Sequence, residues 1–84
     1  MLLSFRKRAW QDYVYWFGCD RKMCKRIHTL IEDTLRHPFA GIGKPEALKG
    51  NLQGFWPRRI DKEHRMVYAI TKDGLIIIQL RHHY

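Results

Sequence analysis

Residues 65–84 read RMVYAITKDGLIIIQLRHHY, and this stretch determines the fold because it predicts a β-hairpin at the end of the chain. Residues 65–70 and 75–84 have the β-branched, aromatic and apolar content of strands. Between them, Thr71-Lys72-Asp73-Gly74 is a polar turn that ends in glycine, which tolerates positive φ. We expect a three-residue loop, because its register gives one uninterrupted apolar face, which a slip by one residue would turn to solvent.

The other face of this hairpin predicts an anion site. The chosen register pairs three apolar residues of each strand: Ile70 with Ile76, Tyr68 with Ile78 and Met66 with Leu80. A two-residue loop of Asp73 and Gly74 would instead place Tyr68 opposite Gln79. On the open face Arg65 falls opposite Arg81, with His83 beside them, and opposed like charges are destabilising unless an anion lies between them. Two guanidinium groups and an imidazole suit a phosphate, although a solvated basic edge fits the composition equally well.

The composition indicates one basic globular domain. Eighty-four residues suffice for a modest core but not for two, so residues 1–84 are expected to form a single domain. Sixteen basic and eight acidic residues give a formal charge of +8, and each half of the chain has the same two-to-one ratio. A charge spread over the whole fold favours nucleic acid, an acidic partner or an anionic membrane surface, without choosing among them.

No targeting or membrane segment is visible, which indicates a cytoplasmic protein. The run Met1-Leu2-Leu3 is too short for a signal peptide, and no apolar run approaches the length of a membrane span. In that compartment the two cysteines are expected to be reduced thiols. Cys19, Cys24 and His28 would leave a zinc site one ligand short, so we expect no metal.

Two helices are expected after a short strand at Leu2–Phe5. In the first helix, which ends at Gly18, apolar side chains at helical spacing predict a core-facing stripe of Trp10, Tyr13, Val14 and Phe17. Trp16 is also expected in the core. Asp20 is a suitable N-cap for the second helix, and His37-Pro38 ends it. Its apolar face consists of Met23, Cys24, Ile27, Leu30, Ile31 and Leu35.

Residues 38–54 are rich in glycine and predict a loop, in which Glu46 is the notable side chain. Gly41-Ile42-Gly43-Lys44 is not a phosphate loop, because it lacks the spacing, the hydroxyl residue and the following helix. Glu46 is the only acid of this stretch. It lies between Lys44 and Lys49, whose charges favour the ionised carboxylate that a general base requires. A surface ion pair is the alternative interpretation.

Phe55–Ile60 predicts a further strand, and Pro57 suggests that it is an edge strand or carries a bulge. If Ile60 faces the core, Arg59 lies on the open face with Arg65. The expected architecture is α+β, with two N-terminal helices packed on one face of a small, mainly antiparallel sheet.

Three stretches form a specific combination that matches a known family. They are Asp12-Tyr13 with Tyr15-Trp16; Gly43-Lys44-Pro45-Glu46, Leu48-Lys49 and Gly54-Phe55-Trp56 with Arg58-Arg59-Ile60; and Glu63-His64-Arg65 with the terminal Arg81, His83 and Tyr84. With these residues the chain resembles, over its full length, the YoeB-type toxins of the RelE superfamily of bacterial toxin–antitoxin systems. Members often have Ser and acidic residues where this chain has Arg6-Lys7-Arg8, a difference that concerns capping and RNA contacts rather than chemistry.

The resemblance implies a toxin that enters the ribosomal A site, cleaves messenger RNA there without a metal or other cofactor, and is held inactive by an acidic antitoxin of the YefM type. It also suggests that the toxin dimerises. Residue by residue, Glu46 matches the general base, His83 the general acid and Arg65 the group that stabilises the transition state, with Tyr84 in a supporting catalytic position. The residues expected to bind substrate are Lys44, Lys49, Arg59 and Arg81.

The residues themselves support the same chemistry. Metal-free RNA cleavage needs a base for the 2′-hydroxyl proton, an acid for the leaving 5′-oxygen and cations for the phosphorane, and each acid–base role contributes about 10²–10⁴-fold. Two alternatives stay open. A non-catalytic relative that binds a protein such as a topoisomerase would need neither Glu46 nor His83, and in a simple RNA-binding module the acid and base would have no purpose. Only the enzyme leaves a new 3′ end in a cleavage assay.

Overall fold

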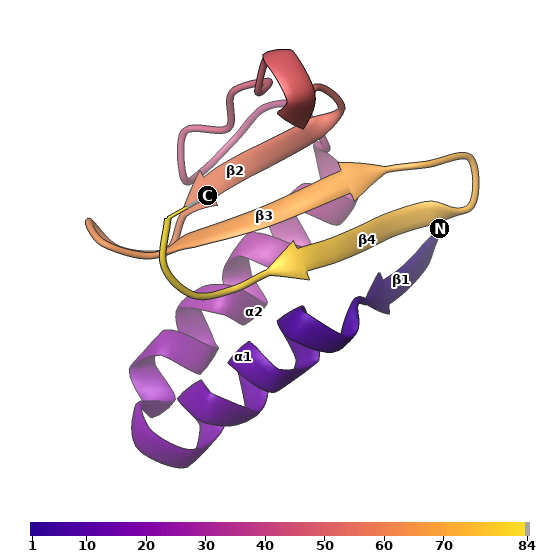
Figure 1. Ribbon diagram of the computed structural model, residues 1–84. Coiled ribbons are helices and arrows are strands. Elements are labelled where there is room, and N and C mark those ends of the chain that lie inside the picture. Colours follow the sequence, from indigo (N-terminus) through magenta and orange to yellow (C-terminus); the bar gives the residue numbers. More distant parts are fainter. Residues whose placement is uncertain (84) are drawn as a thin grey trace.

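The computed structural model describes residues 1–83 and contains two helices, one short 3₁₀ turn and a four-stranded sheet (Figure 1). The elements, in chain order, are β1 Leu2–Phe5, α1 Lys7–Cys19, α2 Arg21–Arg36, η1 Gly50–Leu52, β2 Phe55–Arg59, β3 Arg65–Ile70 and β4 Gly74–Gln79. The expected first strand and both helices are therefore present. No helix in this part of the chain is long and apolar enough to cross a membrane.

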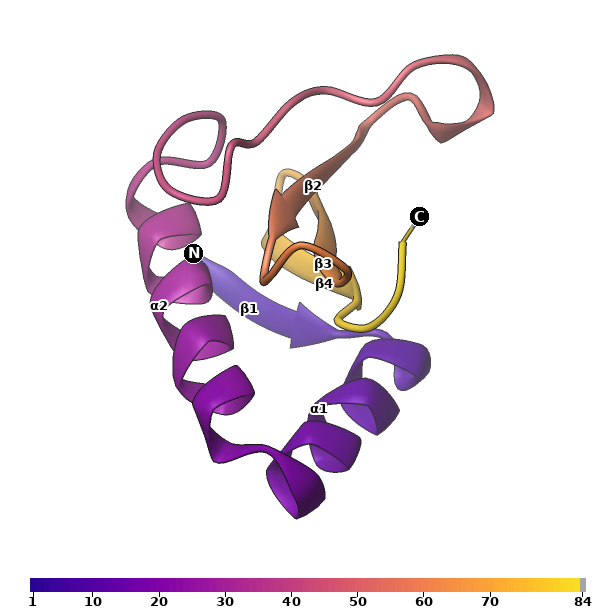
Figure 2. The ribbon, with the colours of Figure 1, turned by 90° about the vertical axis from the view of Figure 1, so that its left-hand side faces the viewer.

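The sheet has the strand order β1-β4-β3-β2 and is antiparallel except where β1 pairs parallel to β4. The expected mainly antiparallel α+β architecture is confirmed. Figure 2 shows α2 along one side of the sheet and the C-terminal tail on the opposite side. The prediction that β2 is an edge strand is also confirmed, and this position leaves room for a proline in it.

The second helix forms as its sequence predicts. The Asp20 carboxylate accepts hydrogen bonds from the backbone N–H groups of Lys22 and Met23, which satisfies donors that a helix start leaves unpaired. The apolar stripe is buried at Met23, Cys24, Ile27, Leu30 and Ile31, with Leu35 packed against it. Each fully buried aliphatic side chain of this kind contributes about 1.5–3 kcal/mol. Both cysteines are free, and burial raises the pKa of the Cys24 thiol.

The predicted core stripe of the first helix is wrong except at Tyr13, which is half-buried against the core. Trp10, Val14 and Phe17 are 54%, 50% and 46% exposed, whereas Trp16 is buried as expected. The buried face instead consists of Ala9, Asp12 and Trp16. Two polar contacts explain this choice, because Asp12 accepts the backbone N–H of Leu80 and the indole N–H of Trp16 donates to the Leu80 carbonyl. Apolar periodicity could not reveal a helix face that is selected partly by hydrogen bonds.

The predicted hairpin register is wrong near the turn. Thr71 and Gly74 exchange backbone hydrogen bonds of 2.8 and 3.2 Å, so the loop has two residues, Lys72 and Asp73, and Ile70 pairs with Leu75. A bulge in β4 then pairs Val67 with Gln79. Gly74 is the physical reason for this register, since its φ is +151° and a Cβ there would collide with the Leu2 backbone of β1.

The register decides which isoleucines are buried. Leu75 and Ile77 are fully buried, and Ile76 and Ile78, which we expected in the core, are half-buried. Because the bulge adds one residue to β4, the alternation of side chains is reset and Leu80 again reaches the core. The expectation that this strand continues to the end of the chain is also wrong, since β4 ends at Gln79.

Candidate active site on the open face of the sheet

The candidate site is a hollow of about 100 Å³ where β2 and β3 lie side by side. The ladder pairs Arg59 of β2 with Arg65 of β3, and Ile60 is buried in the core, as the sequence predicts. Arg59 and Arg65 thus lie opposite each other, and the expectation that they share this face is confirmed. The expected pairing of Arg65 with Arg81 is wrong, because the ladder between β3 and β4 ends at Val67 and Gln79. The residues that line the hollow are Lys44, Glu46, Pro57, Arg59 and Arg65.

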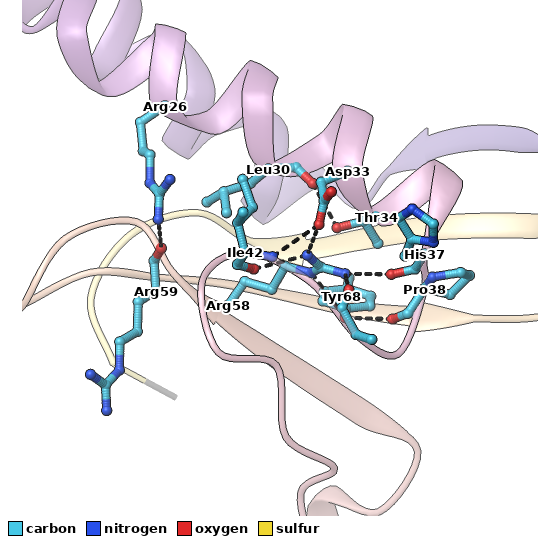
Figure 3. A network of polar contacts seen from close by, with 11 residues as sticks. Arg26, Leu30, Asp33, Thr34, His37, Pro38, Ile42, Arg58, Arg59 and Tyr68 are labelled. Carbon is cyan, nitrogen blue, oxygen red and sulfur yellow. Dashed lines mark hydrogen bonds and ion pairs between the residues drawn. The ribbon is translucent and has the colours of Figure 1, made fainter.

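Arg58 and Arg59 point to opposite sides of β2 because side chains alternate along a strand. Figure 3 shows Arg58 directed toward α2, and Arg59 directed away from it. Arg58 is fully buried. Its guanidinium donates to the Tyr68 hydroxyl (3.2 Å), Asp33 Oδ2 (2.7 Å) and the carbonyls of Ile42 (2.9 Å), His37 (2.6 Å) and Ala40 (2.8 Å). All five of its N–H donors therefore have an acceptor.

This buried network fixes the loop that leads to Glu46. The Asp33 carboxylate also accepts the Ile42 N–H, at 3.0 Å, and the N–H of Arg59 donates to the Gly43 carbonyl at 2.7 Å. The hydrogen bonds from Arg58 and Ile42 hold the pKa of the Asp33 carboxyl below its usual value. Because three carbonyls of residues 37–42 also bind Arg58, the loop is fastened to β2 immediately before Lys44.

The C-terminal part of the same loop is attached to β2 by a backbone hydrogen bond, in which the Leu48 N–H donates to the Phe55 carbonyl at 3.0 Å. Lys44 and Glu46 lie between these two attachment points and are exposed. Within residues 1–83 no ion pair joins Glu46 to Lys44 or Lys49, so the surface ion pair considered above is not formed. Among the described residues, the other side chains that line the hollow beside this carboxylate are cationic or apolar.

Arg65 is held in place by the turn that precedes β3. One guanidinium nitrogen donates to the carbonyls of Asp61 and His64, at 2.9 and 3.1 Å. Burial alone raises the pKa of Asp61, but hydrogen bonds from the backbone of His64 and Glu63 bring it below its usual value. Two arginines directly opposite each other repel unless an anion lies between them. The site is therefore arranged to receive an anionic group next to a carboxylate.

The remaining predicted site residues lie outside the lining of the hollow. Arg81 stacks over the ring of Tyr15 in α1, with its Cζ 3.6 Å from the ring centroid, so it does not lie on the open face as expected. Lys49 is exposed and precedes η1. His83 is exposed on the tail, and its carbonyl accepts from Gln79 Nε2 at 2.9 Å. Tyr84 lies outside the described residues.

Two residues next to the site, Arg58 and His64, have no role that the sequence predicts. The signal for Arg58 is strand alternation, because an expected place for Arg59 on the open face directs Arg58 toward the core, where its guanidinium is buried. His64 directly precedes β3, and its Nδ1 accepts the backbone N–H of His82 at 2.8 Å. Within residues 1–83, no three His, Cys, Asp or Glu side chains are grouped so that they could hold a metal ion.

Comparison with known proteins identifies the family of this chain. Residues 5–84 match the model of the YoeB-like toxin of bacterial type II toxin–antitoxin systems. The chain belongs to this family. It is 55% identical to the toxin YoeB of Streptomyces coelicolor and 54% identical to that of Escherichia coli K12, in both cases over the whole of both chains.

Solved structures of the family have the same fold. A YoeB/ParE toxin from Agrobacterium tumefaciens superposes with a TM-score of 0.97 at 46% identity, over all of both chains. A YoeB from Staphylococcus aureus, 40% identical, matches with TM-scores of 0.92 as a YoeB dimer and 0.91 in a heterotetrameric YoeB–YefM complex, covering 100% of this chain and 98% of that one. The family and its fold are thus established for this chain.

Proposed function

We propose that this toxin is a ribosome-dependent endoribonuclease that cleaves messenger RNA in the A site by metal-free acid–base chemistry. The observation that supports it most directly is the hollow in which one carboxylate, Glu46, lies among three cations, Lys44, Arg59 and Arg65. A site that only bound RNA would gain nothing from a carboxylate there, because it would repel the phosphate. A general base, in contrast, must lie within reach of the ribose 2′-hydroxyl, which is next to the phosphate that is attacked.

In the proposed reaction Glu46 removes the proton of the ribose 2′-hydroxyl. The 2′-oxygen attacks the adjacent phosphorus, and the bond from phosphorus to the 5′-oxygen of the next nucleotide breaks. His83, protonated, donates its proton to that leaving oxygen, and the products are a 2′,3′-cyclic phosphate and a 5′-hydroxyl. Arg65 and Arg59 stabilise the charge that develops on the phosphorane. Lys44, Lys49 and Arg81 are proposed to bind the RNA strand, and Tyr84 to support His83.

The ribosome supplies what the site lacks. The hollow is small, about 100 Å³, and Lys44 and Glu46 on its loop side are exposed, so it does not by itself hold a flexible strand with the 2′-oxygen in line with the leaving group. Correct orientation is worth many orders of magnitude in rate, and a second structure that holds the codon can provide it. The proposed action on ribosomes also places the protein in the cytoplasm.

Cleavage of a defined message tests this function. The free toxin is incubated with translating bacterial ribosomes that carry the message, and separately with the same RNA alone. We expect a new 3′ end within the A-site codon, bearing a cyclic phosphate, and slow or no cutting of the naked RNA. Equally fast cutting of naked RNA would refute ribosome dependence, and a 3′-hydroxyl product would refute the proposed chemistry.

We also propose an acidic antitoxin of the YefM type as the partner that inhibits the toxin. The Staphylococcus aureus relative forms a complex with YefM, and the net charge of +8 here favours an acidic segment. The Arg59–Arg65 pair is the place where such a segment relieves most repulsion. A structure of the complex tests this, since contacts confined to Arg6-Lys7-Arg8 would contradict overlap with the site.

A homodimer is proposed on a separate surface. α1 carries an aromatic row in which the exposed Trp10 and Phe17 stack on either side of the half-buried Tyr13, with ring centroids 5.7 and 6.4 Å apart. Exposed apolar patches of this kind are typical of interfaces. Because a relative at 40% identity forms a dimer, we assign this aromatic row to contact with a second copy.

A further inference from the structure

The tail that carries His83 leaves the sheet after Gln79, and side chains hold the first part of its backbone. The N–H of Leu80 donates to Asp12 at 2.9 Å, and the Leu80 carbonyl accepts from the Trp16 indole at 2.8 Å. The carbonyl of Arg81 accepts from Arg8 at 3.3 Å and from Gln79 Nε2 at 3.1 Å. The start of the tail is therefore fixed to α1.

The next residue, His82, redirects the chain. Its φ is +68°, a left-handed conformation that costs a non-glycine residue energy and persists only when neighbouring groups stabilise it. Both of its backbone polar groups have partners. The N–H donates to His64 Nδ1 at 2.8 Å, and the carbonyl accepts the N–H of Arg65 at 3.0 Å. The backbone of His82 is thereby attached to Arg65, the first residue of β3, and to His64, which directly precedes β3.

The tautomer and the surroundings of the His64 imidazole suit this contact. A backbone N–H can only donate, so Nδ1 of His64 carries a lone pair and the ring hydrogen is on Nε2. The ring is buried against the edge of Trp16, with centroids 4.8 Å apart. The backbone N–H of His64 donates to Asp61 Oδ1 at 2.7 Å, which fixes the turn that carries the residue. These contacts hold the acceptor in one orientation.

We propose that His64 is a positioning residue, which sets the place of the His83 imidazole by holding the N–H of His82 in the left-handed turn. This inference rests on the proposed role of His83 as the general acid. His64 is not one of the described residues that line the hollow, so the proposed role is to position and not to react. Its action is transmitted through one residue of backbone, from the His82 amide to the next side chain.

Two substitutions separate the acceptor from the packing of the ring. His64→Phe keeps a flat ring against Trp16 but leaves the His82 N–H without its acceptor. His64→Asn removes most of the ring but places an oxygen where Nδ1 lies. We therefore expect opposite rankings for stability and rate, with the Phe variant the more stable and the Asn variant the faster.

The measurement is the single-turnover cleavage rate on programmed ribosomes at saturating toxin, with ribosome affinity and thermal unfolding recorded for each variant. His64→Phe should lower the rate by about tenfold or more with little change in affinity, since small displacements of a reacting group are costly. His64→Asn should retain a rate within about threefold of the wild type. Rates that follow thermal stability, with the Asn variant slow and the Phe variant fast, would overturn the inference.

A double-mutant cycle distinguishes this inference from the role of His83 itself. His83→Gln should slow cleavage by about 10²-fold, and adding His64→Phe to it should change the rate by less than about twofold. If His83→Gln cuts at the wild-type rate, the proposed acid is wrong. If His83→Gln is slow but His64→Phe has the same effect in both backgrounds, His83 keeps its role and the positioning role of His64 is refuted.

Discussion

Arg65 is the residue on which the proposed charge stabilisation depends most. Its guanidinium is oriented by the Asp61 and His64 carbonyls and lines the hollow opposite Arg59. Arg65→Ala should lower the single-turnover rate by about 10²-fold or more, because it removes the positive charge that stabilises the negatively charged transition state. Arg36→Ala, which removes an exposed arginine from the end of α2, is the matched control and should cut normally. Similar rates for the two variants would exclude Arg65 from the chemistry.

Asp33 makes the stability of the loop attachment depend on pH. Its pKa is lowered by the hydrogen bonds from Arg58 and from the Ile42 N–H, so the ionised form is favoured in the folded state. A depressed carboxyl pKa contributes stability above the unfolded pKa, near 4, which is lost as the pH falls through the folded value.

Asp33→Asn should therefore lower the unfolding temperature most at neutral pH. The difference from the wild type should stay constant above about pH 5 and shrink steadily below about pH 4. Thermal unfolding of the wild type and the variant at several pH values on both sides of this range measures the difference in unfolding temperature. A difference that is the same at pH 7 and at pH 3 would show that the Asp33–Arg58 pair does not stabilise the fold through its charge.

At the scale of elements, the pairing of β1 with β4 depends on the absence of a side chain at Gly74. Gly74 has a φ of +151°, and an added Cβ would meet the backbone of Leu2. Gly74→Ala should destabilise the protein by about 1–3 kcal/mol through this strain. Gly18→Ala is the control, because a Cβ there meets nothing within 4 Å and α1 continues through it to Cys19.

The control should stabilise the protein by about 0.5–1 kcal/mol, since alanine is favoured over glycine inside a helix. Denaturant unfolding of the two variants provides both values. Equal effects, or a stabilised Gly74→Ala protein, would contradict the parallel pairing of β1 with β4.

The elements also show how far the sequence could predict this structure. The second helix followed from its cap at Asp20 and its apolar stripe, which agree with each other. The buried face of the first helix did not follow, because aromatic residues lie on several sides of this helix. That face is selected by two hydrogen bonds to the backbone of Leu80, whose N–H donates to Asp12 and whose carbonyl accepts from Trp16. The hairpin register depended on a bulge and on contact with β1, neither of which has a local signal in residues 65–80.

The candidate site was predicted only in part, for the same reasons. Glu46, Arg59 and Arg65 meet as expected, since alternation along short strands is simple to follow. Arg81 was misplaced because the predicted strand ran past Gln79, whereas the left-handed turn at His82 ends that extension. The roles of Arg58 and His64 required three-dimensional contacts between segments more than ten residues apart.

At the scale of the whole molecule, the charge of +8 predicts how the toxin finds its antitoxin. The association rate constant for an acidic segment should fall by about tenfold or more when the salt concentration is raised from low to physiological or higher, while the dissociation rate constant changes less. Stopped-flow binding at several salt concentrations measures both rates. An association rate that does not respond to salt would argue against electrostatic recognition on the open face.

The aromatic row of Trp10, Tyr13 and Phe17 makes a second prediction at this scale. Trp10→Glu should shift the protein from dimer to monomer in sedimentation experiments, because it places charge in an apolar contact. Lys72→Glu, in the hairpin loop on another part of the surface, is the control and should leave the sedimentation unchanged. A dimer that persists in the Trp10 variant would place the interface elsewhere.

The most direct test of the proposed chemistry is the single-turnover cleavage rate of Glu46→Gln on programmed ribosomes. The substitution keeps the size of the side chain and removes the proton acceptor, so the rate should fall by about 10²-fold or more while ribosome binding is unchanged. Glu32→Gln, an exposed position on α2, should cut at the wild-type rate. If the Glu46→Gln protein binds ribosomes normally and cuts as fast as the wild type, Glu46 is not the base and the proposed mechanism is wrong.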